Sequence, residues 1–387
     1  MKKRKVVILG STGSIGVNTL KVIDEHKEYF EVVGLSAYNN IKLLEKQILK
    51  FSPNYVAVNE LGFNYLSKVI NKKKTRILDV RSDLDFLVAH KSVDVVVIGM
   101  RSSTALSPFL SAVRAGKLVA PANKEALVIA GEIIMKEARK YKAQVVPVDS
   151  EQSAIYQCLY GQNRSELKKV YLTASGGALL KTPESQFNRL TINKILDHPR
   201  WKMGKKITVD SATLMNKGFE VLEAKNLFNL KTEEIEVIVH PEAIIHSMVE
   251  FRDGSILAQL GVTDMRLPIQ YALTYPKRYK TRLKGMDFSK WNQLNFQKPD
   301  LKKFPSLSLA FYVARKGGSL ASVLNAADEE VVDAFLKEEI KFTSIYKIVE
   351  KIVLKHKIIN DPNLSEILQA DRWAREETRK VLNKSLC

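Results

Sequence analysis

Short apolar runs alternate with amphipathic segments from the start of the chain to about residue 150. Strands are predicted at 6–9, 32–35, 55–58, 93–98, 118–120 and 144–148. Helical patterns lie between them, for example over 15–26, 41–51, 106–115 and 124–141. This alternation predicts a mostly parallel, doubly wound sheet of the Rossmann type. Ligands of such sheets bind beyond the carboxyl ends of the strands.

The pattern changes after residue 150. Strands are predicted at 170–174, 207–209, 237–239, 245–251 and 255–260, with one helix over 211–228. Asp253-Gly254 is a hairpin turn between the last two strands. Helical periodicity returns over 306–316, 320–338, 343–356 and 364–384. We therefore expect an α/β Rossmann-like domain (1–149), a central α+β domain (150–275), a linker (276–305) and a C-terminal helical bundle (306–387).

The segment from Gly10 to Gly16 reads GSTGSIG, follows the first predicted strand and opens a helix. Glycines let the backbone approach a pyrophosphate, and a helix N-terminus supplies amide donors. A tight turn without a ligand can show the same pattern. Ser36 to Asn40, after the second strand, contain no carboxylate to bind the ribose hydroxyl of NAD. The sequence therefore favours NADP as the dinucleotide.

Asp149 and Glu151 follow the last strand of the first region, and Glu220 lies on a predicted helix. Side chains alternate along an extended segment, so Asp149 and Glu151 are expected to point the same way. Three carboxylates suit Mg²⁺ or Mn²⁺ rather than zinc. Each also fits a structural role, as an N-cap, a helix-dipole partner or a solvated helix residue. Together, with Lys124 and Ser150 alongside, they favour a metal site.

A second group of polar side chains suits a phosphate dianion. Ser175, Ser211, Asn216 and Lys217 offer hydroxyls, an amide and an ammonium. We expect Ser211 at a helix start, with Asn216 and Lys217 inside that helix. Helix capping and an ordinary surface lysine are the alternative interpretation.

Trp201 lies in a loop, bounded by proline and glycine, that runs from His198 to Gly204. A tryptophan in a loop either clamps the loop to the protein or covers a ligand as a lid. A lid would exclude water from the reacting centre.

The net charge is +19, but the basic residues are spread along the chain and do not alternate with aromatic residues. This pattern indicates a basic surface rather than nucleic-acid binding, and it would suit a phosphorylated substrate and cofactor. No apolar run approaches the ~20 residues of a membrane-spanning helix, and we expect no membrane partner. The basic start of the chain leads into a strand, not a targeting segment. Cys158 and Cys387 are the only cysteines, which indicates a reducing, cytoplasmic compartment.

These motifs together resemble the 1-deoxy-D-xylulose 5-phosphate reductoisomerase family of the non-mevalonate isoprenoid pathway. The resemblance is carried, in order, by GSTGSIG, ANKEAL, PVDSEQSA, TASGGA, HPRWKMGKKITVDSATLMNKGFEVLEA, HPEAIIHSMVEFRDGS and LAQLGVTDMRLPIQYAL. It implies a homodimeric enzyme that converts 1-deoxy-D-xylulose 5-phosphate to 2-C-methyl-D-erythritol 4-phosphate. In this family a divalent ion stabilises an enolate during retro-aldol cleavage and re-addition. NADPH then delivers a hydride.

The resemblance also implies roles for individual residues. Asp149, Glu151 and Glu220 would bind the metal, and Asp149, Glu151 and Lys124 would be catalytic. The substrate would be held by Ser150, Ser175, His198, Trp201, Ser211, Asn216, Lys217 and Glu220. The cofactor would be held by Gly10, Ser11, Thr12, Gly13, Ser14, Ile15, Gly16, Ala37, Asn39, Asn40, Asn123, Lys124, Glu125, Gly204 and Met265.

The sequence departs from the family at Asn39, where a basic residue often lies beside the 2′-phosphate. That contact is left to Lys42, Asn40 or backbone groups, and Arg101 is a further candidate for a cofactor phosphate. One alternative function is another NAD(P)-dependent oxidoreductase of a phosphorylated substrate. A semialdehyde-dehydrogenase type would need a cysteine nucleophile. The other alternative is a nucleotide-sensing or nucleic-acid-binding module without enzymatic activity.

Overall fold

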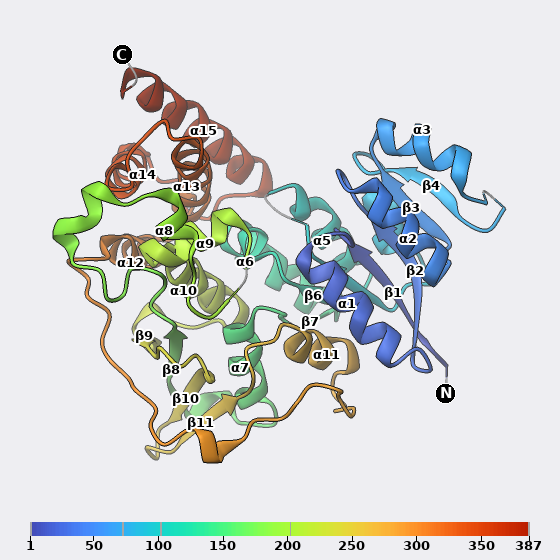
Figure 1. Ribbon diagram of the computed structural model, residues 1–387, viewed down its shortest axis with the longest axis horizontal. Helices are drawn as coiled ribbons and strands as arrows, with labels where there is room; N and C mark the ends of the chain where they lie inside the picture. The colour runs from blue at the N-terminus through green and yellow to red at the C-terminus, as the bar shows by residue number, and fades with distance from the viewer. Residues whose placement is uncertain (1, 72, 101–102, 202, 386–387) are drawn as a thin grey trace. The chain divides into compact units, whose positions relative to one another are not determined.

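The computed structural model describes residues 2–71, 73–100, 103–201 and 203–385, so Arg101 lies outside the described residues. The chain forms two compact units, whose elements are labelled in Figure 1. Unit 1 comprises Met1–Ala126, Ile134–Tyr156 and Asp264–Gly285, and unit 2 comprises Leu127–Ile133, Gln157–Thr263 and Met286–Cys387. The domain limits expected from the sequence stay a prediction.

Unit 1 is built on a parallel sheet, as the strand–helix alternation predicted. Its order is β4-β3-β2-β1-β5-β6-β7. The strands are β1 (Arg4–Leu9), β2 (Phe30–Ser36), β3 (Tyr55–Val58), β4 (Arg76–Asp79), β5 (Val95–Ile98), β6 (Leu118–Pro121) and β7 (Gln144–Val145). The helices that lie wholly in unit 1 are α1 (Ser14–Glu25), α2 (Ile41–Phe51), α3 (Glu60–Val69), α4 (Leu84–Ala89), α5 (Leu106–Arg114) and α11 (Arg266–Thr274). Helices α6 (Lys124–Lys140) and α7 (Ser150–Leu159) belong to it in part. Buried valine and isoleucine in β1 and β5 explain why these runs form central strands.

Two elements of unit 1 were not expected from the sequence. Strand β4 has one buried side chain, Leu78, and therefore shows no apolar run. Helix α11 packs against α1, and the Arg4 guanidinium donates to the carbonyls of Leu273 (2.8 Å) and Tyr275 (2.9 Å) at its C-terminal end. These bonds satisfy carbonyls that a helix end leaves without partners.

Unit 2 contains a mixed sheet of order β11-β10-β8-β9 and a helical C-terminal region. The strands are β8 (Leu167–Ala174), β9 (Ile235–Val239), β10 (Ile245–Phe251) and β11 (Ile256–Leu260). The helices are α8 (Ile192–Leu196), α9 (Lys205–Thr213), α10 (Met215–Phe228), α12 (Pro305–Lys316), α13 (Leu320–Leu336), α14 (Ser344–Lys355) and α15 (Leu364–Ser385). The predicted hairpin is confirmed, with Gly254 at a φ of 85°.

The segment around residue 210 differs from the prediction. The strand expected at 207–209 is wrong, because these residues lie inside α9. The helix expected over 211–228 is divided at Leu214, which has a left-handed φ of 59°. Ionic contacts fix α9: Lys206 Nζ lies 2.6 Å from Oδ2 of Asp210 and 2.6 Å from Oδ2 of Asp328 on α13. Tertiary contacts here outweigh the strand propensity of β-branched residues.

Helix α10, which follows Leu214, is buried almost throughout, so it shows no apolar stripe. A Cβ on Gly218 would lie 2.5 Å from the Ala310 side chain of α12, so glycine permits the close approach of these helices. None of the helices in the described ranges is both long and apolar enough to cross a membrane.

Candidate active site

The turn between β1 and α1 needs glycine at two positions. Gly10 has a φ of 78°, and a Cβ there would lie 2.8 Å from the carbonyl oxygen of Gly99, just past β5. A Cβ on Gly16 would lie 2.3 Å from Ser11 Cα, because the first turn of α1 packs directly on the backbone of the turn. The motif therefore brings α1 as close to the sheet as backbone contact allows.

The accessible part of this turn presents backbone amides. Gly13 and Ser14 are exposed and Thr12 is half-buried. Gly13 is the N-cap of α1 and forms no side-chain cap, and the first turn contains no acidic residue. The first amides of α1 and its positive dipole end are thus suited to an anion, as expected for a pyrophosphate. Ile15 differs, since its side chain packs on the unit 1 core.

Ser11 is fully buried, and its polar groups bond within the protein. Its Oγ donates to Gln47 Oε1 (2.7 Å), while Gln47 Nε2 donates to the Ser11 carbonyl (2.9 Å). Its amide donates to the carbonyl of Ser36 at the end of β2 (2.8 Å). Ser11 therefore shapes the turn, and its predicted contact with the cofactor stays a prediction. Gln47 was missed, because one glutamine on a helix carries no sequence signal.

The segment after β2 lies beside this turn. Ala37 is buried, and Asn39, Asn40 and Lys42 are exposed. The Asn40 side chain caps α2 by accepting from the amide of Leu43 (3.2 Å). Asn39 and Asn40 thus lie just before the N-terminus of α2, the second helix N-terminus near the glycine turn. No carboxylate lies between β2 and α2.

The end of β6 places a buried lysine against a carboxylate. Asn123 caps α6 by accepting from the amide of Ala126 (2.8 Å). Lys124 follows in the first turn, with its side chain 7% exposed, and its Nζ lies 2.6 Å from Asp149 Oδ2. Glu125 is half-buried in the same turn. Asn123 has a structural role of its own, and its predicted cofactor contact stays a prediction, as does that of Glu125.

Asp149 and Glu151 do not alternate along a strand, so that expectation is wrong. Strand β7 ends at Val145, although the amides of Val146 and Val148 still donate to β6 (both 2.9 Å). Glu151 then lies in the first turn of α7. It accepts from Ser150 Oγ at 2.5 Å. Glu151 is thus near the positive end of the helix dipole, which stabilises its charge.

Glu220 is not a solvated helix residue. It is 1% exposed and lies one turn into α10. Its Oε1 accepts from Asn216 Nδ2 at 2.6 Å, and its Oε2 accepts from Lys217 Nζ. Burial of a carboxylate is costly unless it is paired, and here an amide and an ammonium provide the pairing.

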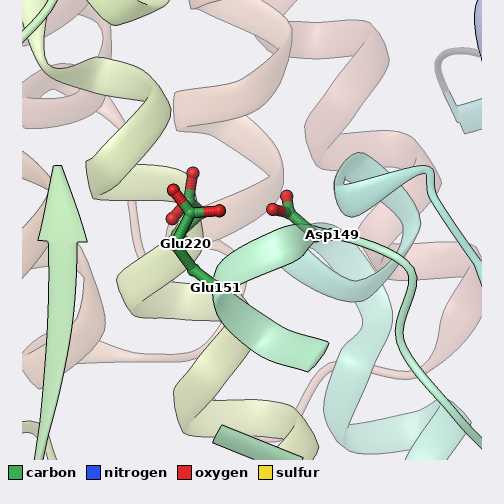
Figure 2. Close-up of side chains that lie close together, drawn as sticks. All are labelled: Asp149, Glu151 and Glu220. Atoms are coloured by element: carbon green, nitrogen blue, oxygen red, sulfur yellow. The ribbon is translucent and has the colours of Figure 1, made fainter. Parts of the chain in front are cut away.

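Asp149, Glu151 and Glu220 each offer one carboxylate oxygen, and these oxygens lie within 4.8 Å of one another. Figure 2 shows the carboxylates of Glu151 and Glu220 side by side, with that of Asp149 facing them. A set of carboxylate oxygens fits a hard divalent cation. Lys124 and Lys217 each contact one member, which reduces the repulsion among the three negative charges.

The residues predicted to hold phosphate come from three neighbouring segments of unit 2. The glycine turn after β8 lies against the end of α9, since a Cβ on Gly177 would lie 2.4 Å from the carbonyl oxygen of Ser211. Ser211 is therefore near the C-terminal end of α9 and not at a helix start, which corrects that expectation. Asn216 and Lys217 open the next helix, α10.

His198 has a defined tautomer. Its Nδ1 accepts from the amides of Trp201 (2.9 Å) and Arg200 (3.2 Å), so Nδ1 carries no proton. Nε2 then carries the hydrogen and contacts Ser175 Oγ at 3.2 Å. Burial lowers the pKa of His198, which favours the neutral ring. The Trp201 ring lies 6.4 Å from the ring of His246.

Two further residues predicted to contact the cofactor begin helices. Gly204 is the N-cap of α9 and accepts from Thr208 Oγ1 at 2.9 Å. Met265 is the N-cap of α11 and packs on the core of unit 1.

Cys158 cannot supply the nucleophile that a semialdehyde dehydrogenase needs. It is 8% exposed, and burial raises the pKa of its thiol to about 11. The thiolate is the nucleophilic form, so this cysteine is inert at neutral pH.

Comparisons with known proteins agree on one family. Residues 6–131 match the family model described as 1-deoxy-D-xylulose 5-phosphate reductoisomerase. Residues 145–228 and 260–377 match two models of its C-terminal domains. The chain is 49% identical to the 1-deoxy-D-xylulose 5-phosphate reductoisomerase of Thermoanaerobacter pseudethanolicus, over 97% of this chain and 99% of the relative. It is 45% identical to that of Endomicrobium trichonymphae, over 98% and 100% of the two chains.

Solved structures give the same result. A crystal structure of DOX-P reductoisomerase in complex with NADPH, fosmidomycin and magnesium matches with a TM-score of 0.94 and 37% identity, over 98% of both chains. The enzyme from Zymomonas mobilis in complex with NADPH matches with a TM-score of 0.93 and 36% identity, over 98% of this chain and 99% of that one. The chain therefore belongs to the 1-deoxy-D-xylulose 5-phosphate reductoisomerase family.

Proposed function

We propose that this chain converts 1-deoxy-D-xylulose 5-phosphate to 2-C-methyl-D-erythritol 4-phosphate, with NADPH and a divalent ion, Mg²⁺ or Mn²⁺. Family membership over nearly the whole chain supports the reaction. The related structure in complex with NADPH, fosmidomycin and magnesium supports both cofactors. The observation that carries the proposal in this chain is the convergence of Asp149, Glu151 and Glu220.

We assign the divalent ion to these three carboxylates. When bound, such an ion stabilises negative charge that develops on substrate oxygens. Asn216 orients Glu220, and Ser150 orients Glu151, through the hydrogen bonds described above. Fixed carboxylates lose little conformational freedom on binding, which favours affinity.

Lys124 and Lys217 have distinct roles in this proposal. Lys124 Nζ is held at Asp149, where it would donate to a substrate oxygen at the reacting end. Lys217 pairs with Glu220, yet it is also a candidate for the substrate phosphate. A cation at Glu220 would neutralise that carboxylate and release the Lys217 ammonium. Metal and phosphate are therefore expected to bind cooperatively.

The substrate phosphate would lie near the ends of β8 and α9 and the start of α10. Ser175, Ser211 and Asn216 supply neutral donors there, and Lys217 supplies the charge. His198 contributes the Nε2 hydrogen, since its Nδ1 is an acceptor. The Trp201 loop would cover the substrate, so that the fragments of a carbon–carbon cleavage stay in place and water stays out.

NADPH would bind at the turn between β1 and α1. The amide of Gly13 donates to the Gly10 carbonyl (3.1 Å), so the amides of Ser14 and of the rest of the first turn of α1 would contact its pyrophosphate. Met265, on the core of the same unit, would lie near the nicotinamide. Hydride transfer requires that this ring reach the substrate held by the carboxylates.

A homodimer is also part of the proposal. Strand β11 is an edge strand, and Ile256 and Leu257 on it are 49% and 41% exposed. Exposed apolar edge strands pair readily with another chain. Light scattering should give twice the mass of one chain, and Leu257→Lys should shift the population toward the monomer. A monomeric wild-type protein would refute this part.

The free, buried Cys158 supports a reducing compartment, and we propose the cytoplasm.

The decisive assay follows NADPH oxidation with 1-deoxy-D-xylulose 5-phosphate as substrate. Turnover should require added Mg²⁺ or Mn²⁺, stop with a chelator and return with excess metal. The product should be 2-C-methyl-D-erythritol 4-phosphate. Turnover that survives the chelator, or NADPH oxidation without this product, would contradict the proposal. Salt-sensitive binding to DNA would favour the nucleic-acid module instead.

A further inference from the structure

The carboxyl ends of β2, β3 and β4 lie side by side at one end of the parallel strands. Ser36 of β2 pairs with Ala57 of β3, and Val58 of β3 pairs with Asp79 of β4. The turn that follows β4 therefore lies at the same end of the sheet as the segment after β2. Ligands of a doubly wound sheet bind beyond these carboxyl ends.

One arginine from the β4 turn reaches the segment after β2. Arg81 follows β4 by two residues, and its NH2 donates to the hydroxyl of Tyr38 at 3.2 Å. Tyr38 follows β2 by two residues, and its carbonyl accepts from Asn59 Nδ2, at the end of β3, at 2.9 Å. Arg81 thus contacts the side chain of Tyr38, the residue before Asn39, and Asn59 at the end of β3 holds the Tyr38 backbone in place.

This position matters because the 2′-phosphate of NADPH is expected after β2. Asn39 is neutral there, and Asn40 is engaged in capping α2. A phosphate dianion needs a cation, and arginine offers a planar fork of donors that matches phosphate oxygens. Arg81 is exposed, so this fork is accessible to a ligand. The charges of Asp79 and Glu60 are also near the guanidinium, and Asp79 Oδ1 accepts from the Arg81 amide at 2.7 Å.

We infer that Arg81, positioned by the Tyr38 hydroxyl, binds the 2′-phosphate of the cofactor and gives this chain its preference for NADPH over NADH. The inference rests on the proposed cofactor site and adds a residue for dinucleotide specificity. Arg81 takes the place of the basic residue that is missing at position 39, where this chain has Asn39. It comes from the turn after β4, which is distant in the sequence. Lys42, on the first turn of α2, is the competing cation.

The test is direct binding of two probes to the full chain, without substrate or metal. Adenosine 2′,5′-bisphosphate carries the 2′-phosphate, and 5′-AMP lacks it. Arg81→Ala should weaken bisphosphate binding by about tenfold or more and leave AMP binding unchanged. Tyr38→Phe should weaken bisphosphate binding by a smaller factor. The NADPH to NADH affinity ratio should fall in parallel, and more so at low salt.

Arg76→Ala is the matched control, because Arg76 is exposed at the start of β4, the end of the strand opposite to Arg81. Its affinity for both probes should equal that of the wild type, and all variants should keep the wild-type unfolding temperature. Unchanged bisphosphate affinity in Arg81→Ala would overturn the inference. An equal loss of affinity for both probes in Arg81→Ala would also overturn it. So would a loss of bisphosphate affinity that is found in Lys42→Ala alone. Failure of the turnover assay would refute the proposed function while these binding results stood.

Discussion

Replacing Gly16 by alanine tests the most tightly packed point of the cofactor turn. The new Cβ would lie 2.3 Å from Ser11 Cα and 2.5 Å from the Gly10 carbonyl oxygen. Non-bonded carbons normally approach to about 3.5 Å, so the backbone must separate by roughly 1 Å. Overpacking of this kind costs about 1–3 kcal/mol, and we expect the upper end because the neighbours are backbone atoms. Displaced amides should also weaken NADPH binding, by about tenfold for each hydrogen bond to phosphate that is lost.

Chemical denaturation and NADPH fluorescence titration measure these two effects. Gly13→Ala is the matched control, since its Cβ would lie 3.4 Å from the Gly10 carbonyl oxygen and its φ is −78°. Its stability should stay within about 0.5 kcal/mol of the wild type. Wild-type values of both stability and NADPH affinity in Gly16→Ala would show that this turn does not depend on the close contact of residue 16.

Three further outcomes follow from buried polar groups. In a Cys387→Ser variant, Cys158 should react with a thiol reagent at pH 8 only after unfolding. Its pKa of about 11 leaves roughly one thiolate in a thousand at that pH, and rapid labelling of the native chain would contradict this. Gln47→Leu should cost about 2 kcal/mol in denaturant unfolding, because Ser11 loses both buried partners; wild-type stability would count against it. Burial lowers the pKa of His198 below 6.5, so the unfolded chain binds more protons and stability should fall as the pH drops below 6.5. In His198→Gln this loss between pH 7 and pH 5 should be smaller, and an unchanged pH dependence would contradict the assignment.

The sequence predicts unit 1 well, because its central strands are buried on both faces. β1 and β5 are apolar runs, and the spacing of Gly10 and Gly16 reflects a contact that the structure bears out. Strand β4 has no apolar run, because a single one of its four side chains is buried. No local pattern therefore indicates this strand.

The errors elsewhere have physical causes. The strand predicted at 207–209 is helical because Lys206 and its two buried aspartates hold α9 in place, and such contacts are not readable from one segment. Helix α10 shows no amphipathic pattern because nearly all of it is buried.

For the candidate site, the residue types predicted the chemistry, but not the backbone that holds it. Asp149 and Glu151 were expected on an extended segment, whereas a helix begins at Ser150. The three carboxylate oxygens come together only in the tertiary structure, so no single segment of the sequence indicates their convergence. The pairing of Tyr38 with Arg81 had no sequence signal, since it depends on the register of β2, β3 and β4.

In the proposed function, Asp149, Glu151 and Glu220 share one divalent ion. Calorimetric titration of Mn²⁺ into the wild type, Glu220→Gln and Glu223→Gln tests it most directly. Glu223 is equally buried on the same helix and lies outside the group of three. We predict that Glu220→Gln weakens Mn²⁺ binding by at least about 100-fold, because loss of a ligand should cost no less than loss of an outer-shell partner, and that Glu223→Gln binds like the wild type. Wild-type Mn²⁺ affinity in Glu220→Gln, or an equal loss in Glu223→Gln, would contradict the claim.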